Sequence, residues 1–291
     1  MWLTIQNDHL SLSVNTLGAE MMSLRSVDGT EYLWQGDPKY WSDRAINLFP
    51  FIGRLTNNSY CLRETQYPMS IHGFAWTSEF AVVEKMTDRL ILELTDNEET
   101  RKQYPFAFSF RITYVLKDDK VEITLSVENR SETVMPFGVG GHPGFNVPLV
   151  EGEQFEDYSI TFSQTCLPDR VGFTPAVYMS GYDERYLLED DVLIRLRHDL
   201  FDDDAIILKN MAREVTLKSE KCGKGVKVTY PDLGYLGIWH MPKTDAPYVC
   251  IEPWSSLPSR QDVVEDLYCK SDMIQLPATQ IYETTWSITV L

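Results

Sequence analysis

Four short stretches of the sequence carry side chains that could move protons, each in a loop marked by glycine or proline. The stretches are "NLFPFIGRLTNN" (47–58) with Arg54, "SIHGFAW" (70–76) with His72, "GVGGHPGFNVP" (138–148) with His142, and "YVCIEPWSSLPS" (248–259) with Glu252. Two imidazoles, a guanidinium and a carboxylate can bind a polar substrate and exchange protons with it, without a metal or cofactor. Functional groups are often found on such loops over a rigid scaffold. Taken singly, each residue could equally be a turn residue or a structural ion-pair partner.

Glu252 and His142 are the main candidates for acid–base chemistry. Glu252 follows the apolar run "YVCI" and precedes Pro253, so we expect its carboxylate at a strand end, where burial raises the pKa toward that of a useful base. Pro253 restricts Glu252 to extended backbone angles, and Pro143 does the same for His142. An imidazole titrates near pH ~6.5, so it can donate and recover a proton at neutral pH. The glycines around His142 would let a ligand approach closely.

Apolar and polar residues alternate over much of the chain, as they do in half-buried strands. Residues 106–116 and 121–127 show this alternation on either side of "KDDK" (117–120), which predicts a long antiparallel hairpin. Shorter runs of the same kind lie at 10–14, 90–94 and 282–290. Because long amphipathic helices do not alternate with these strands, a doubly wound or α/β-barrel fold is disfavoured. The pattern predicts an all-β chain folded as one large antiparallel β-sandwich.

Helical patterns are few and short. The stretch "NEETRKQY" (97–104) is predicted to form a turn or two of helix between strands. The stretch "SRQDVVEDLY" (259–268) gathers its apolar residues on one helical face, which predicts a short surface helix.

Composition and charge limit the classes of function. The 291 residues are 43% hydrophobic and 12% aromatic, enough for a sizeable core, and we expect a single domain over residues 1–291. The formal net charge of −17 argues against nucleic acid or an anionic membrane surface as a partner. The first residues, "MWLTIQND", lack the pattern of a signal peptide, and five scattered cysteines without a C-x-x-C pair are typical of reduced thiols. We therefore expect a cytoplasmic protein.

Taken together and in order, the four stretches resemble the aldose 1-epimerase (galactose mutarotase) family, most closely its LacX-like branch. Three further stretches resemble family segments: "LGAEMMSL" (17–24), "EYLWQGDPKYW" (31–41) and "DDDAIIL" (202–208). The resemblance covers nearly the whole chain. It implies the galactose mutarotase-like supersandwich, a large antiparallel β-sandwich, which agrees with the predicted strands.

The resemblance also implies an activity, the interconversion of the α and β anomers of an aldohexose by ring opening and reclosure, with no cofactor and no metal. Glu252 falls on the family's base and His142 on its acid, placed on opposite sides of the C–O bond that opens. His72 and Arg54 fall on positions that contact the substrate around the ring oxygen, and we expect His72 to be a third catalytic residue. The implied partner is a small-molecule sugar, bound by a monomer or homodimer.

Further residues are candidates for holding the sugar. Asp204 resembles a hydroxyl-binding carboxylate of the family, and which of Asp202, Asp203 and Asp204 faces the site stays open. Aromatic rings can cover the apolar face of a pyranose, and the candidates are Trp254, Trp239, Phe74 and Trp76.

Two other functions retain the sandwich and a sugar ligand. A non-catalytic sugar-binding or regulatory protein is possible, although binding alone needs no acid–base pair. An epimerase for hexose 6-phosphates would need a basic pocket, to which Arg44, Arg54 and Lys243 could contribute. The charge of −17 argues mildly against such a pocket.

Two other enzyme classes fit the sequence less well. A metal-dependent sugar enzyme would use His72, His142 and His240, which lie far apart in the sequence and form no H-x-H or H-x-x-x-H pair. A glycoside hydrolase would need two carboxylates beside the glycosidic bond, and in the sequence only Glu252 is well placed.

Overall fold

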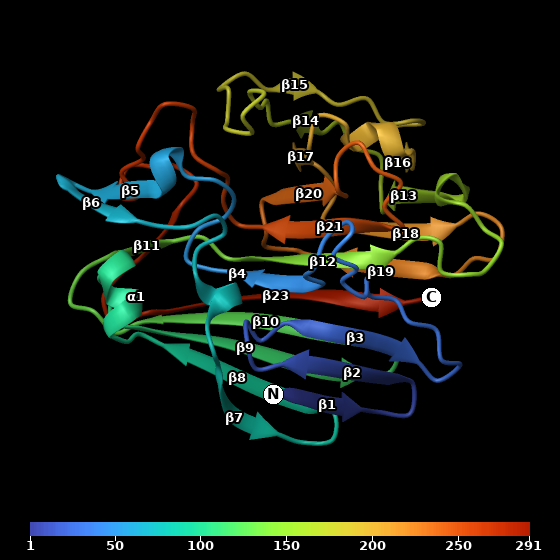
Figure 1. The fold of residues 1–291 in the computed structure, drawn as a ribbon, viewed down its shortest axis with the longest axis horizontal. Helices are drawn as coiled ribbons and strands as arrows, with labels where there is room; N and C mark the ends of the chain where they lie inside the picture. The colour runs from blue at the N-terminus through green and yellow to red at the C-terminus, as the bar shows by residue number, and fades with distance from the viewer.

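Two antiparallel sheets packed face to face make up most of the structure, a computed structural model that describes residues 1–291 (Figure 1). The larger sheet has nine strands, in the spatial order β16 (Leu193–Arg195), β13 (Tyr158–Phe162), β18 (Glu214–Ser219), β19 (Gly225–Thr229), β23 (Ile281–Val290), β10 (Lys120–Asn129), β9 (Phe108–Lys117), β8 (Arg89–Thr95) and β7 (Ala81–Lys85). The smaller has seven, in the order β15 (Glu184–Arg185), β14 (Asp169–Arg170), β17 (Ile206–Lys209), β20 (Tyr235–Trp239), β21 (Tyr248–Trp254), β12 (Gly140–Asn146) and β4 (Ala45–Leu48). This architecture confirms the predicted all-β sandwich.

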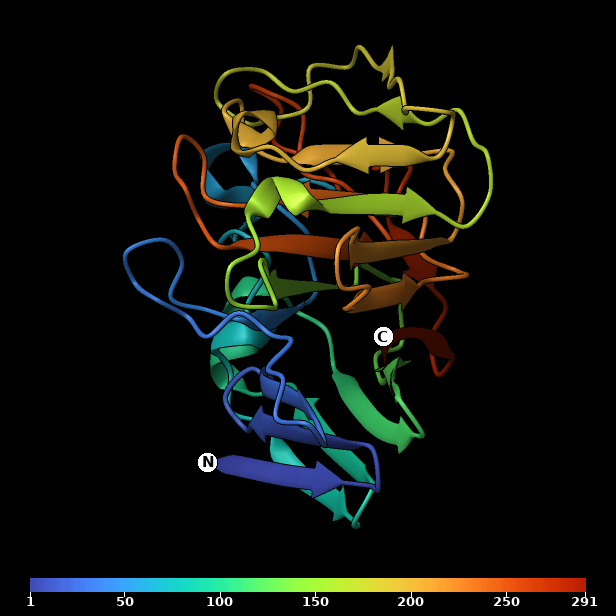
Figure 2. The same cartoon turned by 90° about the vertical axis from the view of Figure 1, so that its right-hand side faces the viewer.

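Three small sheets and a few short helices complete the fold. The sheets are β1 (Trp2–Gln6), β2 (Leu10–Asn15) and β3 (Met21–Ser26); β5 (Ser59–Leu62) with β6 (Thr65–Pro68); and β11 (Met135–Phe137) with β22 (Ile274–Leu276). The helices are α1 (Glu98–Gln103) and the 3-10 turns η1 (Thr56–Asn58), η2 (Ala75–Thr77), η3 (Phe155–Asp157) and η4 (His198–Phe201). In Figure 2 the sheet β1–β3, in blue, lies at the end of the molecule opposite the yellow strands. None of the helices has the length and apolarity that crossing a membrane requires.

The main core lies between the two large sheets. Its 64 buried residues form one contiguous cluster that runs from Ile5 to Val290. A single domain over residues 1–291 stays a prediction. At the interface Asn47 donates a buried hydrogen bond of 3.1 Å to the Tyr114 hydroxyl. A Cβ at Gly141 would lie 2.5 Å from the Trp286 ring, so only glycine lets strand β12 approach β23 this closely.

The predicted hairpin and first helix are both confirmed. Strands β9 and β10 pair from Lys117↔Lys120 outward, with the two-residue turn where the sequence has "DD". Helix α1 begins after Asn97, whose side chain accepts hydrogen bonds from two backbone N–H groups of the first turn. Such caps stabilise a short helix by about 1 kcal/mol.

The predicted helix at 259–268 is wrong. Its backbone bonds instead to the small sheet of β5, where the Cys61 N–H donates to the Glu265 carbonyl (2.8 Å) and the Leu267 N–H donates to the Cys61 carbonyl (3.0 Å). Asp262 has a positive φ of 60°, which a helix does not allow. Tertiary pairing has therefore overridden the apolar periodicity of this stretch.

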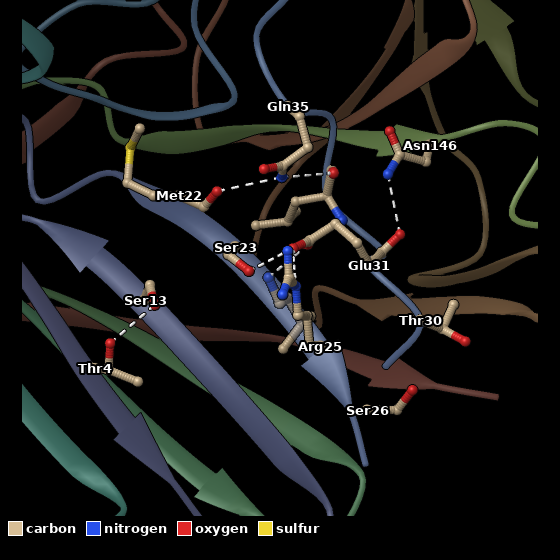
Figure 3. A network of polar contacts seen from close by, with 12 residues as sticks. Thr4, Ser13, Met22, Ser23, Arg25, Ser26, Thr30, Glu31, Gln35 and Asn146 are labelled. Atoms are coloured by element: carbon tan, nitrogen blue, oxygen red, sulfur yellow. Dashed lines mark hydrogen bonds and ion pairs between the residues drawn. The ribbon is translucent and has the colours of Figure 1, made fainter. Parts of the chain in front are cut away.

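A polar network around Glu31 joins the small N-terminal sheet to the seven-stranded sheet (Figure 3). The Glu31 carboxylate accepts hydrogen bonds from the Ser23 hydroxyl, the Leu24 N–H (2.8 Å) and the Arg25 guanidinium (3.0 Å). On its other side, the Asn146 side chain at the end of β12 donates to the Glu31 carbonyl (3.0 Å). The network holds the end of β12, the strand that carries His142.

Candidate active site

A cavity of about 520 Å³ lies over the face of the seven-stranded sheet that points away from the main core. Residues alternate between the two faces of β12, so that Gly141 packs against the core and His142 lines the cavity. Strands β4, β17, β20 and β21 supply further lining side chains, and loops supply the rest. The volume falls within the roughly 300–1,000 Å³ typical of small-molecule sites.

His142 and Glu252 face each other across two neighbouring strands. The register pairs Gly140 with Trp254 and Gly144 with Cys250, which places His142 opposite Glu252 between these pairs. Nε2 of His142 lies 3.1 Å from Oε2 of Glu252. Both side chains are buried, and Nδ1 of His142 has no hydrogen-bond partner. Unpaired buried polar atoms are costly, so they mark a place where a ligand would bind.

The β12–β21 register therefore places the two groups side by side on one face of the sheet. The expectation that they stand on opposite sides of the bond that opens stays a prediction.

Burial sets the proton affinity of this pair. It raises the pKa of the Glu252 carboxyl well above its usual value, and the negative charge of Asp204 adds to the rise. Burial also lowers the pKa of His142 well below its usual value, and His72 acts in the same direction. Both shifts favour a protonated carboxyl group beside a neutral imidazole. Transfer of the carboxyl proton of Glu252 to Nε2 of His142, over 3.1 Å, would give a carboxylate and an imidazolium. The total number of protons on the pair would not change.

His72 enters the cavity from a neighbouring loop as a hydrogen-bond donor. The Gly53 N–H donates to Nδ1 of His72 (3.2 Å), so the neutral ring carries its proton on Nε2. Burial, followed by the charge of Arg54, lowers the pKa of His72 to about 4, which keeps the ring neutral at physiological pH. The His72 and His142 ring centroids lie 5.6 Å apart. His72 also has a positive φ of 62°, an unusual backbone conformation that is common at functional sites.

The structure brings both predicted charged binding residues to the cavity. Arg54 lines it from the loop after Gly53 and is exposed. Asp203 and Asp204 line it from the segment before β17, whereas Asp202 lies outside this cavity. The question left open by the sequence is thus answered in favour of two of the three aspartates.

Tryptophans form much of the apolar wall, as predicted for Trp254, Trp239 and Trp76. Phe74 does not line the cavity. Its ring is buried in the main core, where it packs against Phe49 and Phe108 with centroids 6.0 Å away in each case. The turn η2 directs the Phe74 ring inward, so we leave Phe74 out of the proposed site.

Several lining residues were not found by sequence reasoning. Trp41 covers His142, with ring centroids 4.8 Å apart, and Asp43 lines the same cavity. Phe173 and Val177 come from the loop after β14, which the sequence analysis did not single out. Trp41 lies within "EYLWQGDPKYW", so the resemblance offered a signal for it. The loop at 172–183 offered none.

The donor set does not favour a resident metal. His240 does not line the cavity: its ring is fully buried, bonded to His198 (3.1 Å) and to the Met241 carbonyl (2.8 Å). One group of possible ligand atoms, from His142, Cys250 and Glu252, lies within 4.8 Å. Burial raises the pKa of the Cys250 thiol well above its usual value, and Cys250 does not line the cavity.

Comparison with known proteins agrees with the geometry. A family model described as aldose 1-epimerase matches residues 1–264. The plasmid-encoded protein LacX of Lactococcus lactis subsp. lactis is 33% identical over 300 residues, covering 100% of both chains.

Two solved structures are similar over the whole chain. A galactose mutarotase related enzyme from Lactobacillus acidophilus is 36% identical, with a TM-score of 0.95, covering 100% of this chain and 97% of that one. A galactose mutarotase-like protein from Lactobacillus casei ATCC 334 is 31% identical, with a TM-score of 0.94 and full coverage of both chains. The chain therefore belongs to the aldose 1-epimerase family.

Proposed function

We propose that this protein is a cofactor-independent mutarotase, which interconverts the α and β anomers of an aldohexose by opening and reclosing its ring. The observation that carries the proposal is the buried pair of His142 and Glu252, 3.1 Å apart on the floor of a tryptophan-lined cavity. The family assignment supports carbohydrate isomerase chemistry. The aldohexose and the roles of individual residues are our inference.

A side-by-side acid and base suits the bond that must break. The hydroxyl oxygen and the ring oxygen of a hemiacetal are bonded to the same anomeric carbon, so the groups that act on them must lie within a few ångströms of each other. Glu252 takes the proton of the anomeric hydroxyl while His142 gives a proton to the ring oxygen. The bond from C1 to the ring oxygen breaks, and a carbonyl forms at C1.

Reclosure restores both groups. After rotation about C1–C2, the ring hydroxyl attacks the other face of the carbonyl, returns its proton to His142, and the new anomeric oxygen receives the proton held by Glu252. The pair carries the same number of protons before and after. A carboxylate with a raised pKa is a stronger base, and an imidazolium with a lowered pKa is a stronger acid, so both shifts assist these transfers.

The other cavity residues position the sugar. In this proposal Nε2–H of His72 and the Arg54 guanidinium donate hydrogen bonds to oxygens around the ring, while Asp204 accepts from a hydroxyl. Trp254 and Trp239 cover apolar faces of the pyranose. We also propose a cytoplasmic location, because all five cysteines are free, as is usual in a reducing compartment.

The test is anomer exchange measured by NMR on a panel of freshly dissolved α-aldohexoses, with spontaneous mutarotation as the baseline. We expect catalysed exchange of at least one free sugar, unchanged by a chelator. Loss of activity on chelation, with recovery on adding a divalent ion, would contradict the cofactor-independent chemistry. Binding of sugars without any catalysed exchange would instead identify a sugar-binding protein.

A methyl glycoside is a necessary control, since the structure brings Asp43, Asp203 and Asp204 into the cavity with Glu252. More than one carboxylate is thus available, which a glycoside hydrolase would need. A blocked anomeric oxygen cannot lose a proton, so a mutarotase leaves the methyl glycoside intact. Release of methanol would identify a hydrolase.

A further inference from the structure

Lys270 is a buried charged residue that does not line the cavity and has no part in the proposed chemistry. Its side chain is 3% exposed, and its Nζ lies 2.6 Å from Oδ2 of Asp272, whose side chain is 9% exposed. The same Nζ lies 5.8 Å from the centre of the buried Phe51 ring, within the range of a cation–π contact. Lysine side chains are almost never buried this deeply unless they are paired.

Stability alone is a weak explanation for this ion pair. Removing two charges from water is unfavourable, and their mutual attraction often does not compensate for it. Apolar side chains of similar size at such positions are often as stable or more stable. The contacts that the pair makes with neighbouring segments are therefore a better guide to its role.

Asp272 holds residues 257–260, which follow β21 and are called the bracing segment below. Oδ2 of Asp272 accepts a hydrogen bond from the Leu257 N–H (2.6 Å) as well as from the Lys270 ammonium group. Lys270 thus keeps the carboxylate in the position that the backbone bond requires. The next residue of the bracing segment, Pro258, lines the cavity.

The bracing segment in turn holds the backbone around Arg54. The Ser259 N–H donates to the Arg54 carbonyl (2.9 Å), and the Ser259 hydroxyl accepts from the Thr56 N–H (2.8 Å). A Cβ at Gly53 would lie 2.4 Å from Cγ of Pro258, so the proline ring packs directly against the residue before Arg54. Because the Arg54 side chain is exposed, its backbone largely determines where the guanidinium lies in the cavity.

We propose that Lys270 and Asp272 are positioning residues for sugar binding, which hold the bracing segment and, through it, the backbone of Arg54. The inference rests on the proposed mutarotase function, in which the Arg54 guanidinium donates hydrogen bonds to oxygens of the sugar. Neither member of the buried pair touches the sugar. Loss of the pair therefore weakens sugar binding, while the proton transfers of Glu252 and His142 continue.

The test removes the pair without leaving an unpaired buried charge. Lys270→Met combined with Asp272→Leu, the apolar variant, replaces both charges with side chains of similar size, a change that buried pairs often tolerate. It also removes the acceptor for the Leu257 N–H. We expect the KM of the exchanged sugar to rise roughly three- to tenfold, as for the loss of one hydrogen bond, with little change in kcat.

A conservative variant and a control make the test specific. Lys270→Met combined with Asp272→Asn, the asparagine variant, also removes both charges, but its amide oxygen can still accept from the Leu257 N–H. Its KM should therefore return toward the wild-type value. Glu153→Gln alters another buried carboxylate, which accepts hydrogen bonds from two hydroxyl groups (2.6 and 2.8 Å) and does not line the cavity. It should lower stability in urea titrations and leave KM unchanged.

A double-mutant cycle tests whether the pair acts through Arg54. Arg54→Ala alone should raise KM, because it removes the donor. Adding the two substitutions of the apolar variant to Arg54→Ala should raise KM little further, since the group that they misplace is already absent. Fully additive increases in KM would overturn the proposed route.

Hydrogen exchange of backbone amides measures the brace without any sugar. The Ser259 and Thr56 amides should exchange faster in the apolar variant and at nearly wild-type rates in the asparagine variant. An unchanged KM in the apolar variant, or a fall in kcat alone, would overturn the positioning role and leave the mutarotase function intact. If the wild type exchanged no sugar, the mutarotase function would fail. The amide exchange rates would then decide whether the pair holds the backbone of Arg54.

Discussion

The indole ring of Trp41 covers the imidazole of His142, with centroids 4.8 Å apart and planes inclined by 35°. An aromatic face attracts a cation within about 6 Å, so Trp41 favours the imidazolium form that burial disfavours. The acid of the proposed mechanism is therefore tuned by two opposing effects, one from desolvation and one from the tryptophan face.

This contact predicts a graded effect of substitutions at Trp41. Trp41→Leu removes the π-face and should lower kcat roughly 2- to 30-fold, as expected from about 0.5–2 kcal/mol of cation–π stabilisation. Trp41→Phe keeps a weaker face and should fall between the wild type and the leucine variant. Steady-state rates of anomer exchange for the three proteins would establish this order. Equal rates for the leucine and phenylalanine variants would show that the aromatic face does not contribute.

Substitution of the pair should abolish most of the chemistry and retain sugar binding. Glu252→Gln keeps the shape but removes the basic oxygen, and His142→Asn removes the acid; each should lower kcat by about 10²–10⁴-fold with a smaller change in KM. The double variant should be little worse than either single one, because the two groups act as a unit. Sugar binding by calorimetry is the control. Wild-type rates for Glu252→Gln would move the base to another residue.

His72 should matter for binding as much as for rate. His72→Asn is compatible with the positive φ of 62°, since asparagine tolerates this conformation, but it loses the Nε2–H donor. We expect kcat/KM to fall roughly 5- to 100-fold, with a larger share in KM than for His142→Asn. A fall in kcat alone, with KM unchanged, would indicate that His72 is itself the acid.

Asp204 should help to set the upper limit of the pH range in which the protein is active. Its negative charge contributes to the raised pKa of Glu252, so Asp204→Asn lowers that pKa and the pair loses its proton at a lower pH. The alkaline limb of the kcat/KM profile should therefore move to lower pH, and KM should rise because a hydroxyl acceptor is weakened. Asp202→Asn, which changes a residue outside the cavity, is the matched control. A shift to higher pH would contradict the assigned contact.

The stability of the fold should decrease in mild acid because of His240. Burial lowers the pKa of His240 to about 4, whereas an unfolded histidine titrates near ~6.5. Between these values the unfolded chain binds a proton that the folded chain does not, so the free energy of unfolding falls as the pH falls through this window. In urea titrations, His240→Gln should reduce the loss of unfolding free energy between pH 7 and pH 5. An unchanged loss of unfolding free energy in His240→Gln would contradict this assignment.

Much of the architecture and several site residues could be predicted from the sequence. Alternation of apolar residues is a local property that depends on the two-residue repeat of a strand, so the β9–β10 hairpin and the all-β class followed from it. Glycine and proline mark loops by their own backbone limits, which is why Arg54, His72, His142 and Glu252 stood out and why all four line one cavity.

Tertiary structure alone decided how these residues meet. The distance of 3.1 Å between His142 and Glu252 depends on the register of β12 against β21, which joins segments more than a hundred residues apart. Long-range pairing also turned residues 259–268 away from the helix that their local periodicity favours, because β5 offers backbone partners there. Phe74 belongs to the core and Trp41 to the site for the same reason: the direction of a side chain in a loop depends on what the rest of the chain packs around it.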